Sequence, residues 1–424
     1  MAPVDKPKFI FDPLLGLMDV TKVLLLLDEE RFQSLGFKYQ LGLVSTIFPS
    51  ATHTRKQHSL GAYGRTKKLT ADWLHHGFIK ETEAFCLQVY ALYHDIGHGP
   101  FSHVTERLGK IDHDMRGLKI IEGLKDKFVA VGCDYNLLHD LFSRKNSLYL
   151  AVFDKNLGTE KLDYLERDAF YTLGERPGVE FLAKHTYFID GKLVINEVAV
   201  DQAKAIQEFY IKMSKNVYLR KKAAILQRLV EKMTHKLMGD GLSEKGLFNL
   251  TDAGLFGRFE LSKNKLVKFY YSRFMAGIFP KLTLEFKYQS ANPDTGFVNK
   301  TIQTIGVDSG ALDRLISSPR VNNLFELEKL ENKIADLTKI PAKFLLIIPP
   351  FSKNRFEPED IYVYNKERKI RRVSDIYPNH FAAMKEYGRS HLGLRIAVYN
   401  EYRKNLYDQS EKVKNYLLKF TENV

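Results

Sequence analysis

The sequence predicts a mainly α fold, with a large helical core that contains a β-hairpin and a smaller α+β lobe at the C-terminal end. Up to about residue 261, apolar residues recur at spacings of three to four, which is typical of helices, in the segments 20–44, 157–173 and 201–238. Residues 81–95 form a strongly apolar stretch that suits a buried helix. Beyond about residue 261, alternating and continuous apolar runs indicate strands. A chain of 424 residues is long for one simple domain, so we expect one domain over 1–261 and a second over 262–424.

The expected strands are short. Residues 185–195 alternate around Asp190-Gly191, and Asp-Gly is a favoured two-residue hairpin turn. In the lobe, Leu282–Tyr288 alternates like a half-buried strand, and Phe344–Ile348 is a continuous apolar run that precedes two prolines. Residues 361–364 indicate a further strand. Toward the C-terminus the pattern becomes helical again.

The composition is that of a soluble globular protein. Hydrophobic residues make up 44% and charged residues 27% of the chain, which argues against wholesale disorder. Cys86 and Cys133 are too few for a disulfide framework, and no Cys-x-x-Cys is present for a thiolate metal site. The apolar run Val23–Leu27 is too short to span a bilayer and ends in acidic residues. We therefore expect a cytoplasmic protein without a membrane partner.

The charge is strongly positive. Lys and Arg number 64 against 51 Asp and Glu, which gives a net charge of +13. This excess favours anionic partners, namely nucleotides, phosphates or nucleic acid, although a basic surface that is merely solvated explains it equally well. Neither Gly-x-x-x-x-Gly-Lys-Ser/Thr nor Gly-x-Gly-x-x-Gly is present, so a P-loop or Rossmann nucleotide site is not expected.

The histidines are unevenly distributed. Of the 13 in the chain, eight lie between His53 and His113, and a solvated surface gives no reason for such crowding. An adjacent His94-Asp95 pair can offer a nitrogen and an oxygen to one divalent cation. His98 follows four residues later on the same helical face, and the intervening glycines break the chain so that His103 stays close. This density is unlike that of a satisfied core histidine.

A second group of polar residues has helical spacing. Glu160, Tyr164 and Asp168 recur every four residues and so share a face, with Lys161 beside them. A carboxylate, a phenol and a cation on one face suit a metal, a sugar and a phosphate. The alternative is an amphipathic surface helix whose leucines point inward.

Longer motifs resemble those of a known family. They are His53-Thr-Arg-Lys-Gln-His58-Ser-Leu-Gly61, His94-Asp-Ile-Gly-His98-Gly-Pro-Phe-Ser-His103 and Asp163-Tyr-x-x-Arg167-Asp168. They resemble the HD-domain phosphohydrolases, in particular the deoxynucleoside triphosphate triphosphohydrolases of the dGTPase-like and SAM-and-HD-domain branch. The resemblance is dense over residues 9–175 and faint in the C-terminal lobe. It implies a helical HD-domain core and metal-dependent hydrolysis of a dNTP to a deoxynucleoside and inorganic triphosphate.

The resemblance also implies roles for individual residues. It implies one divalent ion (Mn, Fe, Co, Ni, Zn or Mg), a nucleotide substrate and a homo-oligomer. The implied metal ligands are His58, His94 and Asp95, with Glu160 at the fourth ligand position. The remaining implied roles are acid–base or phosphate-lining work for His98, His103 and His113 with Glu106 as an acidic partner, phosphate contacts for Arg55 and Lys161, and deoxyribose contacts for Gln40, Tyr164, Asp168 and Tyr218.

The sequence departs from the family pattern at several positions. Family members usually carry Asp where this chain has Glu160, and Asp163 is a rival ligand because it lies near the same helix face. Leu15 replaces an early histidine, and Ser34 and Gly36 replace two arginines. In the activated members this early region helps to bind a regulatory nucleotide. We therefore expect hydrolysis without nucleotide activation, or with an effector that binds differently.

Two alternatives to a dNTPase remain. The first is an HD phosphohydrolase that acts on a nucleoside monophosphate or on a cyclic or signalling nucleotide. The second is a nucleic-acid-binding protein with a vestigial HD site, for which the basic stretches Arg220–Lys222 and Lys366–Arg372 provide candidate contacts.

Overall fold

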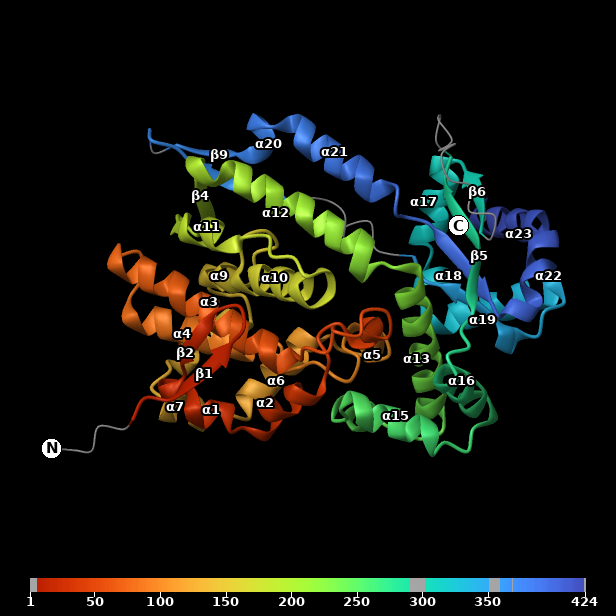
Figure 1. The fold of residues 1–424 in the computed structure, drawn as a ribbon, viewed down its shortest axis with the longest axis horizontal. Helices are drawn as coiled ribbons and strands as arrows, with labels where there is room; N and C mark the ends of the chain where they lie inside the picture. Colours follow the sequence, from red (N-terminus) through yellow and green to blue (C-terminus); the bar gives the residue numbers. More distant parts are fainter. Residues whose placement is uncertain (1–5, 290–301, 351–358, 368, 423–424) are drawn as a thin grey trace. The chain divides into compact units, whose positions relative to one another are not determined.

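A computed structural model describes residues 6–289, 302–350, 359–367 and 369–422. The chain divides into two compact units, each assembled from separate stretches of sequence (Figure 1). The first comprises Met1–Val217, Glu244–Leu255 and Pro358–Phe381, and the second comprises Tyr218–Ser243, Phe256–Glu357 and Ala382–Val424. The two units are made of several stretches each, whereas the sequence predicts two domains with one boundary after residue 261. Whether the chain has two domains that fold independently at that boundary stays a prediction. The mainly helical fold class with small sheets is confirmed.

The first unit is built around helix α3, which packs against α4 and α10 (Figure 1). A capping box starts α3, because the Thr54 side chain accepts from the Gln57 amide while the Gln57 side chain accepts from the Thr54 amide. Helix α10 ends at Gly174, whose φ of 69° stops a helix. The helices of this unit are α1 (Leu24–Leu27), α2 (Glu30–Ser34), α3 (Arg55–His75), α4 (Glu81–Tyr93), α5 (His103–Glu106), α6 (His113–Glu122), α7 (Lys125–Ala130), α8 (Tyr135–Phe142), α9 (Leu150–Phe153), α10 (Thr159–Leu173), α11 (Val179–Lys184), α12 (Val200–Met213), α14 (Glu244–Phe248) and α20 (Val373–Ile376).

The helical pattern over residues 20–44 does not form one long helix. It forms α1 and α2 together with 3₁₀ turns at Thr21–Val23, Leu35–Phe37 and Gly42–Thr46. Asp28 ends α1, and Gly42 adopts a φ of 52°, which a continuous helix cannot accommodate. The apolar residues of this segment therefore pack in the interior, while Asp28 and Gly42 interrupt the helix.

The predicted hairpin is confirmed and is part of a larger sheet. β3 (Thr186–Ile189) and β4 (Lys192–Asn196) pair antiparallel around Asp190-Gly191, both of which have positive φ. β8 (Tyr362–Tyr364) then pairs parallel with β4, and β9 (Ile370–Arg372) pairs antiparallel with β8, so the order is β3-β4-β8-β9. A strand expected in the C-terminal lobe thus completes the sheet of the first unit.

A hairpin near the N-terminus was not expected from the sequence. β1 (Phe9–Asp12) and β2 (Gly16–Asp19) pair antiparallel, with the turn closed by Gly16 at a φ of 76°. The Asp12 carboxylate is buried and accepts a hydrogen bond from Arg167 of α10 at 2.8 Å. This ion pair ties the hairpin to the helix that carries several of the predicted site residues.

The second unit is an α+β structure around a four-stranded sheet of order β6-β5-β10-β7. β6 runs parallel to β5, while β10 runs antiparallel to both β5 and β7. Its apolar core packs side chains of the sheet against α17, α19 and α23. The strands are β5 (Lys281–Tyr288), β6 (Gln303–Val307), β7 (Leu345–Ile348) and β10 (Leu394–Val398), and the helices are α13 (Lys221–Gly239), α16 (Lys265–Met275), α17 (Ser309–Ser317), α18 (Pro319–Asn322), α19 (Leu324–Thr338), α22 (Arg403–Asp408) and α23 (Ser410–Glu422); α15 (Asp252–Glu260) and α21 (Pro378–Arg389) each have residues in both units.

A buried ion network holds the second unit together. Glu331 of α19 accepts hydrogen bonds from Arg228 and Lys232 of α13, at 3.1 Å and 2.6 Å, and from the backbone amide of Ile347 at 3.0 Å. The Arg228 and Lys232 side chains are buried as well. Removing one partner of such a network leaves uncompensated charge in the interior.

We expect Glu331→Gln to lower the free energy of unfolding by about 3–5 kcal/mol, because the two cations lose their shared counter-charge. The matched control is Glu326→Gln on the same helix, where Glu326 pairs with the exposed Lys329. A surface pair of this kind contributes about 1 kcal/mol or less. Urea unfolding of both variants measures the difference, and equal losses would contradict the expectation.

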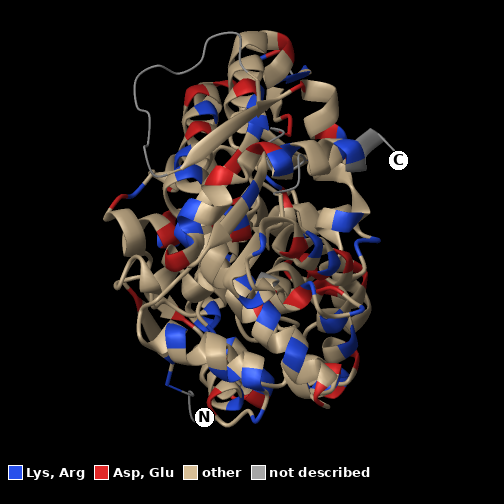
Figure 2. Ribbon diagram, turned by 90° about the vertical axis from the view of Figure 1, so that its right-hand side faces the viewer, with Lys and Arg blue, Asp and Glu red and all other residues tan. Residues whose placement is uncertain are grey.

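The charged residues are distributed over both units. In Figure 2, Lys and Arg positions are interleaved with Asp and Glu positions along the helices and strands. Many of these charges are engaged in ion pairs, such as Lys212 with Glu175. Among the described residues, none of the helices combines the length and the apolar character needed to cross a bilayer.

Candidate active site

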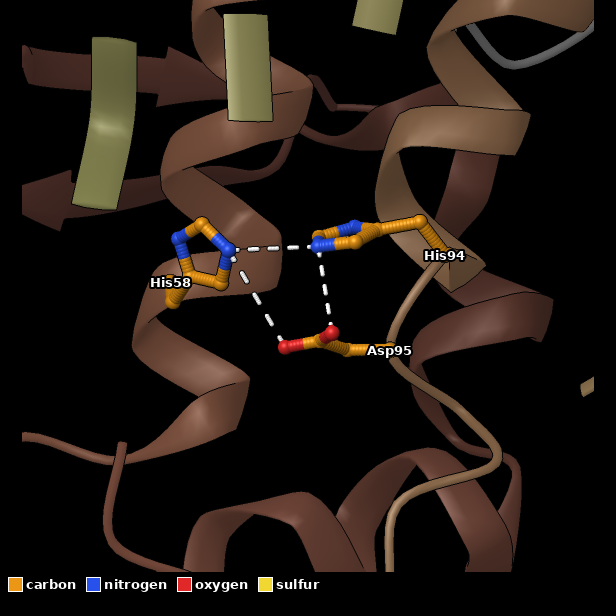
Figure 3. A group of neighbouring side chains, drawn as sticks. All are labelled: His58, His94 and Asp95. Atoms are coloured by element: carbon orange, nitrogen blue, oxygen red, sulfur yellow. Dashed lines mark hydrogen bonds and ion pairs between the residues drawn. The ribbon is translucent and has the colours of Figure 1, made fainter. Parts of the chain in front are cut away.

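Three predicted metal ligands converge inside the first unit. His58 lies on α3, His94 caps the C-terminal end of α4, and Asp95 follows it (Figure 3). His58 Nε2 lies 3.1 Å from His94 Nε2 and 3.9 Å from Asp95 Oδ2, and His94 Nε2 lies 3.3 Å from Asp95 Oδ1. All three side chains are buried. Among the described residues, this cluster has the geometry to hold a metal ion.

The other ring nitrogen of each histidine has its own partner. His58 Nδ1 lies 2.9 Å from Asp163 Oδ2, and His94 Nδ1 lies 2.7 Å from the carbonyl oxygen of Ala91. Since both partners are acceptors, each Nδ1 carries the proton and the two Nε2 lone pairs face each other. Two facing lone pairs at 3.1 Å need a shared cation, either a proton or a metal ion. The donor set therefore fits a divalent ion.

The electrostatics favour the ligating forms of His94 and Asp95. Burial opposes the charge on His58, but the hydrogen bond to Asp163 and the nearby carboxylates raise the pKa of His58 above its ordinary value. Burial lowers the pKa of His94 to about 4, so this imidazole is neutral at pH 7. Burial opposes ionisation of Asp95, but Arg55 and the neighbouring imidazoles hold its pKa well below the ordinary value. A neutral imidazole and an ionised carboxylate are the forms that bind metal.

Glu160 and Asp163 lie on different sides of His58. Glu160 Oε1 is 3.9 Å from His58 Nε2, the nitrogen that faces the cluster, and the side chain is 23% exposed. Burial raises the pKa of Glu160 to about 7, and Asp95 nearby adds to this shift. Asp163 instead contacts the Nδ1 side of the ring. Glu160 thus lies on the cluster side of His58 and Asp163 on the opposite side, and the assignment of Glu160 as the fourth ligand stays a prediction.

Asp163 is fixed by two arginines. Arg167 donates to it from both Nε and Nη2, at 2.9 Å and 3.0 Å, and Arg65 donates at 3.2 Å. Although burial opposes its ionisation, these cations and the His58 hydrogen bond hold the pKa of Asp163 well below its ordinary value. A Cβ at Gly61 would lie 2.2 Å from Asp163 Oδ1. Only glycine at this position lets α3 approach α10 closely enough for the His58–Asp163 contact.

The predicted phosphate contact Arg55 lies at the edge of the cluster. Its Nη1 donates to Asp95 Oδ2 at 2.6 Å, and its Nε donates to Ser102 Oγ at 2.6 Å. The guanidinium therefore links α3 both to a candidate ligand and to the loop that follows it. Sequence reasoning did not single out Ser102, since a lone serine between Phe and His carries no local signal.

Two further histidines stack beside Asp95. The rings of His98 and His113 are 4.0 Å apart between centroids and nearly parallel. His98 Nε2 lies 3.2 Å from Asp95 Oδ1, and Glu106 Oε1 lies 2.6 Å from His113 Nδ1. Burial and Arg55 hold the pKa of His98 well below its ordinary value. Burial also opposes the charge on His113, but Glu106 raises the pKa of His113 above its ordinary value.

The sequence-predicted substrate contacts of α10 are in the same unit. The Lys161 ammonium is buried and lies 3.1 Å from the ring centroid of Tyr210, with the Tyr164 ring also nearby. Asp168 is held by His53, whose Nε2 lies 2.8 Å from Asp168 Oδ1. Neither Tyr210 nor the His53 contact was expected from the sequence, because both pairings join distant segments.

The remaining predicted residues are placed as follows. Gln40 lies in the first unit, and its amide oxygen is buried without a hydrogen-bond partner among the described residues. Tyr218 belongs to the second unit, where it packs against the apolar core. His103 begins α5, and its side chain is outside the part of the chain that the structure describes.

The comparisons with known proteins agree with this geometry. Residues 55–147 match the HD domain family, a range that contains Arg55, His58, His94, Asp95 and His113. A phosphohydrolase from Bacteroides thetaiotaomicron has a similar fold, with a TM-score of 0.71 at 21% identity over 93% of this chain and 100% of its own. This likeness concerns the fold alone.

Two sequence relatives are named as deoxynucleoside triphosphate triphosphohydrolases. The SAMHD1 homolog of Dictyostelium discoideum is 27% identical over 294 residues, which cover 60% of this chain and 55% of the relative. Human SAMHD1 is 37% identical over 112 residues, which cover 24% of this chain and 17% of the relative. The chain thus spans about half or less of the length of the curated relatives that it matches. This chain therefore contains an HD domain at residues 55–147 and has proteins named as SAMHD1 triphosphohydrolases among its relatives.

Proposed function

We propose that this chain is a metal-dependent phosphohydrolase that cleaves a deoxynucleoside triphosphate to the deoxynucleoside and inorganic triphosphate. The observation that carries the proposal is the convergence of His58 Nε2, His94 Nε2 and the Asp95 carboxylate on one buried point. The HD domain match covers this same part of the chain, and relatives named as deoxynucleoside triphosphate triphosphohydrolases match part of the chain. That similarity supports the choice of substrate.

The residues suit one divalent ion with mixed nitrogen and oxygen ligands. His58, His94 and Asp95 would hold it, with Glu160 as the fourth ligand, and the ion would be Mn, Fe, Co, Ni, Zn or Mg. When bound, the ion would supply Lewis acidity that polarises a phosphoryl oxygen. Asp163 keeps the Nδ1 of His58 protonated, so that Nε2 stays available as a ligand.

His113 is the better proton donor of the two stacked histidines. Glu106 favours the charged form of His113, whereas His98 is held neutral. A protonated imidazole can deliver its proton to the departing 5′-oxygen of the nucleoside. The neutral His98 ring, stacked on His113 and close to Asp95, would line the reacting phosphate. For His103, acid–base or phosphate-lining work stays a prediction.

The cations and the sugar contacts complete the proposal. Arg55 and the buried Lys161 would balance the charge of the triphosphate. Asp168, fixed by His53, and Tyr164 would hold the deoxyribose, and the unpartnered amide oxygen of Gln40 would accept a hydrogen bond from it. Tyr218 stays a predicted sugar contact; it packs against the apolar core of the second unit.

The test is product analysis. The protein is stripped with a chelator, reloaded with one divalent metal at a time, and incubated with each dNTP, each ribonucleoside triphosphate and each deoxynucleoside monophosphate. We expect inorganic triphosphate and deoxynucleoside in equal amounts from at least one dNTP, measured by ion-exchange chromatography. Orthophosphate release, or turnover of monophosphates alone, would contradict the proposal and favour another HD phosphohydrolase.

Three expectations from the sequence stay predictions. They are the homo-oligomer, the cytoplasmic location and the binding of nucleic acid through basic residues. The basic stretch that ends at Arg372 includes strand β9, which has exposed Arg371 and Arg372, and this exposure is compatible with either a solvated surface or an anionic partner.

A further inference from the structure

A segment from far along the chain packs against the loops of the candidate active site. The segment Glu244–Leu255 belongs to the first unit, although the residues on both sides of it belong to the second. Glu244 accepts a hydrogen bond from the Lys110 amide at 2.9 Å, and Asn249 accepts one from Arg31 at 2.8 Å. These contacts dock the segment at several points.

Phe248 of this segment fills a space that a glycine leaves open. A Cβ at Gly99 would lie 2.4 Å from Phe248 Cδ1, so the ring packs directly on the backbone of the loop Gly97–Ser102. The Arg116 guanidinium lies over the Phe248 ring, 3.5 Å from the ring centroid. Arg116 also donates a hydrogen bond to the carbonyl oxygen of Gly97 at 3.0 Å. The segment therefore contacts the loop that separates His98 from His103.

Asp252 joins this loop to a second one. Its buried carboxylate accepts from the Phe101 amide with Oδ1 at 2.7 Å, and from the Tyr39 amide with Oδ2 at 2.8 Å. The first amide belongs to the loop that leads to His103, and the second precedes Gln40. Lys38 adds a parallel tie between the same two loops, because its Nζ donates to the His98 carbonyl at 2.6 Å.

The loop needs such support, because two of its residues adopt an unfavourable backbone conformation. Phe101 and Ser102 have φ values of 51° and 48°, in the left-handed region that residues with a Cβ rarely adopt. A conformation of this kind persists only where the surroundings over-determine it. The hydrogen bond from the Phe101 amide to Asp252 provides that restraint.

The restraint reaches the candidate metal ligands. Ser102 Oγ accepts from Arg55 Nε at 2.6 Å, and Arg55 donates in turn to Asp95 at 2.6 Å. The path from Asp252 thus runs through the backbone of Phe101 and Ser102 to Arg55 and Asp95. Asp252 touches none of the candidate ligands itself.

We propose that Asp252 is a positioning residue that holds the loops carrying His98 and Gln40 in the geometry required for turnover. The proposal rests on the proposed function for its kinetic part, while its structural part can be measured without substrate. Asp252 acts through two backbone amides and through Arg55, so it needs no contact with the nucleotide.

The test compares Asp252→Asn with the wild type. The amide of Asn keeps the shape, but its nitrogen cannot accept from a backbone N–H, so one of the two ties is lost. Hydrogen exchange followed by mass spectrometry should then show faster exchange in the peptide whose amide has lost its acceptor, which contains either Tyr39 or Phe101, with no change in peptides of α4. Metal content per chain should stay the same, and kcat should fall by about 10²-fold, the size typical of a small misplacement of reacting groups.

Asp134→Asn is the control for loss of the charge alone. Asp134 accepts from two backbone amides in the first unit, those of Asn136 and Leu137 at the start of α8, but both bond to its Oδ1, which Asn retains. It should leave kcat unchanged. Wild-type exchange at Tyr39 and Phe101 in Asp252→Asn would overturn the proposal, and so would faster exchange with unchanged kcat. If exchange rises in α4 as well, the role is merely structural and the proposal fails. If the wild type turns over no dNTP, the proposed function fails, while the exchange measurement still decides whether Asp252 ties the loops.

Discussion

Replacing Asp95 with Ala is expected to remove the divalent ion and to lower dNTP turnover by about 10³-fold or more, since Lewis-acid stabilisation of this kind contributes several kcal/mol. Asp95 would have two tasks in the proposed site. It would offer the oxygen ligand between two imidazoles, and it pairs with Arg55 as its counter-charge. Its loss would leave the buried guanidinium without this partner, so both the metal site and a phosphate contact would be disturbed.

Elemental analysis and calorimetric titration with Mn²⁺ measure the metal part of this prediction. The control is Asp201→Ala, because the Asp201 side chain is 90% exposed and lies on α12. Metal retained by Asp95→Ala at the stoichiometry of the wild type would show that the cluster is not the binding site. Unfolding temperatures of both variants are needed to exclude general misfolding.

The same titration separates Glu160 from Asp163. Because Glu160 faces the cluster, Glu160→Ala should weaken binding and Glu160→Asp should keep or improve it. Because Asp163 contacts only the far nitrogen of His58, Asp163→Asn should cost about 10–100-fold in affinity without abolishing binding, as is usual for partners of a ligating histidine. If Asp163→Ala loses the ion while Glu160→Ala holds it, the assignment of Glu160 is wrong.

His113→Ala is expected to lower kcat by about 10²–10⁴-fold while leaving metal content unchanged, because an acid–base group is lost and no ligand is. His139→Ala is a suitable control, since His139 lies on α8 and pairs with the exposed Glu122. Unchanged turnover in His113→Ala would refute the role of His113 as the proton donor.

Glu106→Gln tests the same role through pH. Glu106 raises the pKa of His113, so removing its charge should lower that pKa. The protonated form of His113 would then be lost at a lower pH than in the wild type. The basic limb of the kcat profile should therefore move to lower pH, and a limb that stays in place would mean that another group donates the proton.

The sequence was sufficient for the parts of the site that are local. Short motifs reveal the pair His94-Asp95, His58 on the preceding helix, and the spacing of Glu160 on α10. The structure brings His58, His94 and Asp95 together. The hairpin turn at Asp190-Gly191 was likewise predictable, because its conformation depends on those two residues alone.

The contacts that no motif reveals join residues distant in sequence. The spacing on the helix makes Asp163 a rival ligand, but only the packing of α3 against α10 decides which nitrogen of His58 it contacts. Asp252 looks like an ordinary polar residue near a helix start until the Tyr39 and Phe101 amides are placed beside it. Hydrophobic periodicity could not show that β8 pairs with β4, because strand partners are chosen by tertiary packing.

The order of strands in the first unit has a consequence for the synthesis of the protein. β4 ends at Asn196, whereas its neighbour β8 begins at Tyr362. The ribosome must therefore add more than a hundred further residues before the edge of β4 that faces β8 can form its hydrogen bonds. Until then the hairpin exposes a row of open backbone groups, which are a template for association with other chains. Fragments cut before residue 362 should therefore aggregate during expression even when they contain every candidate metal ligand, and a co-expressed C-terminal fragment should rescue them.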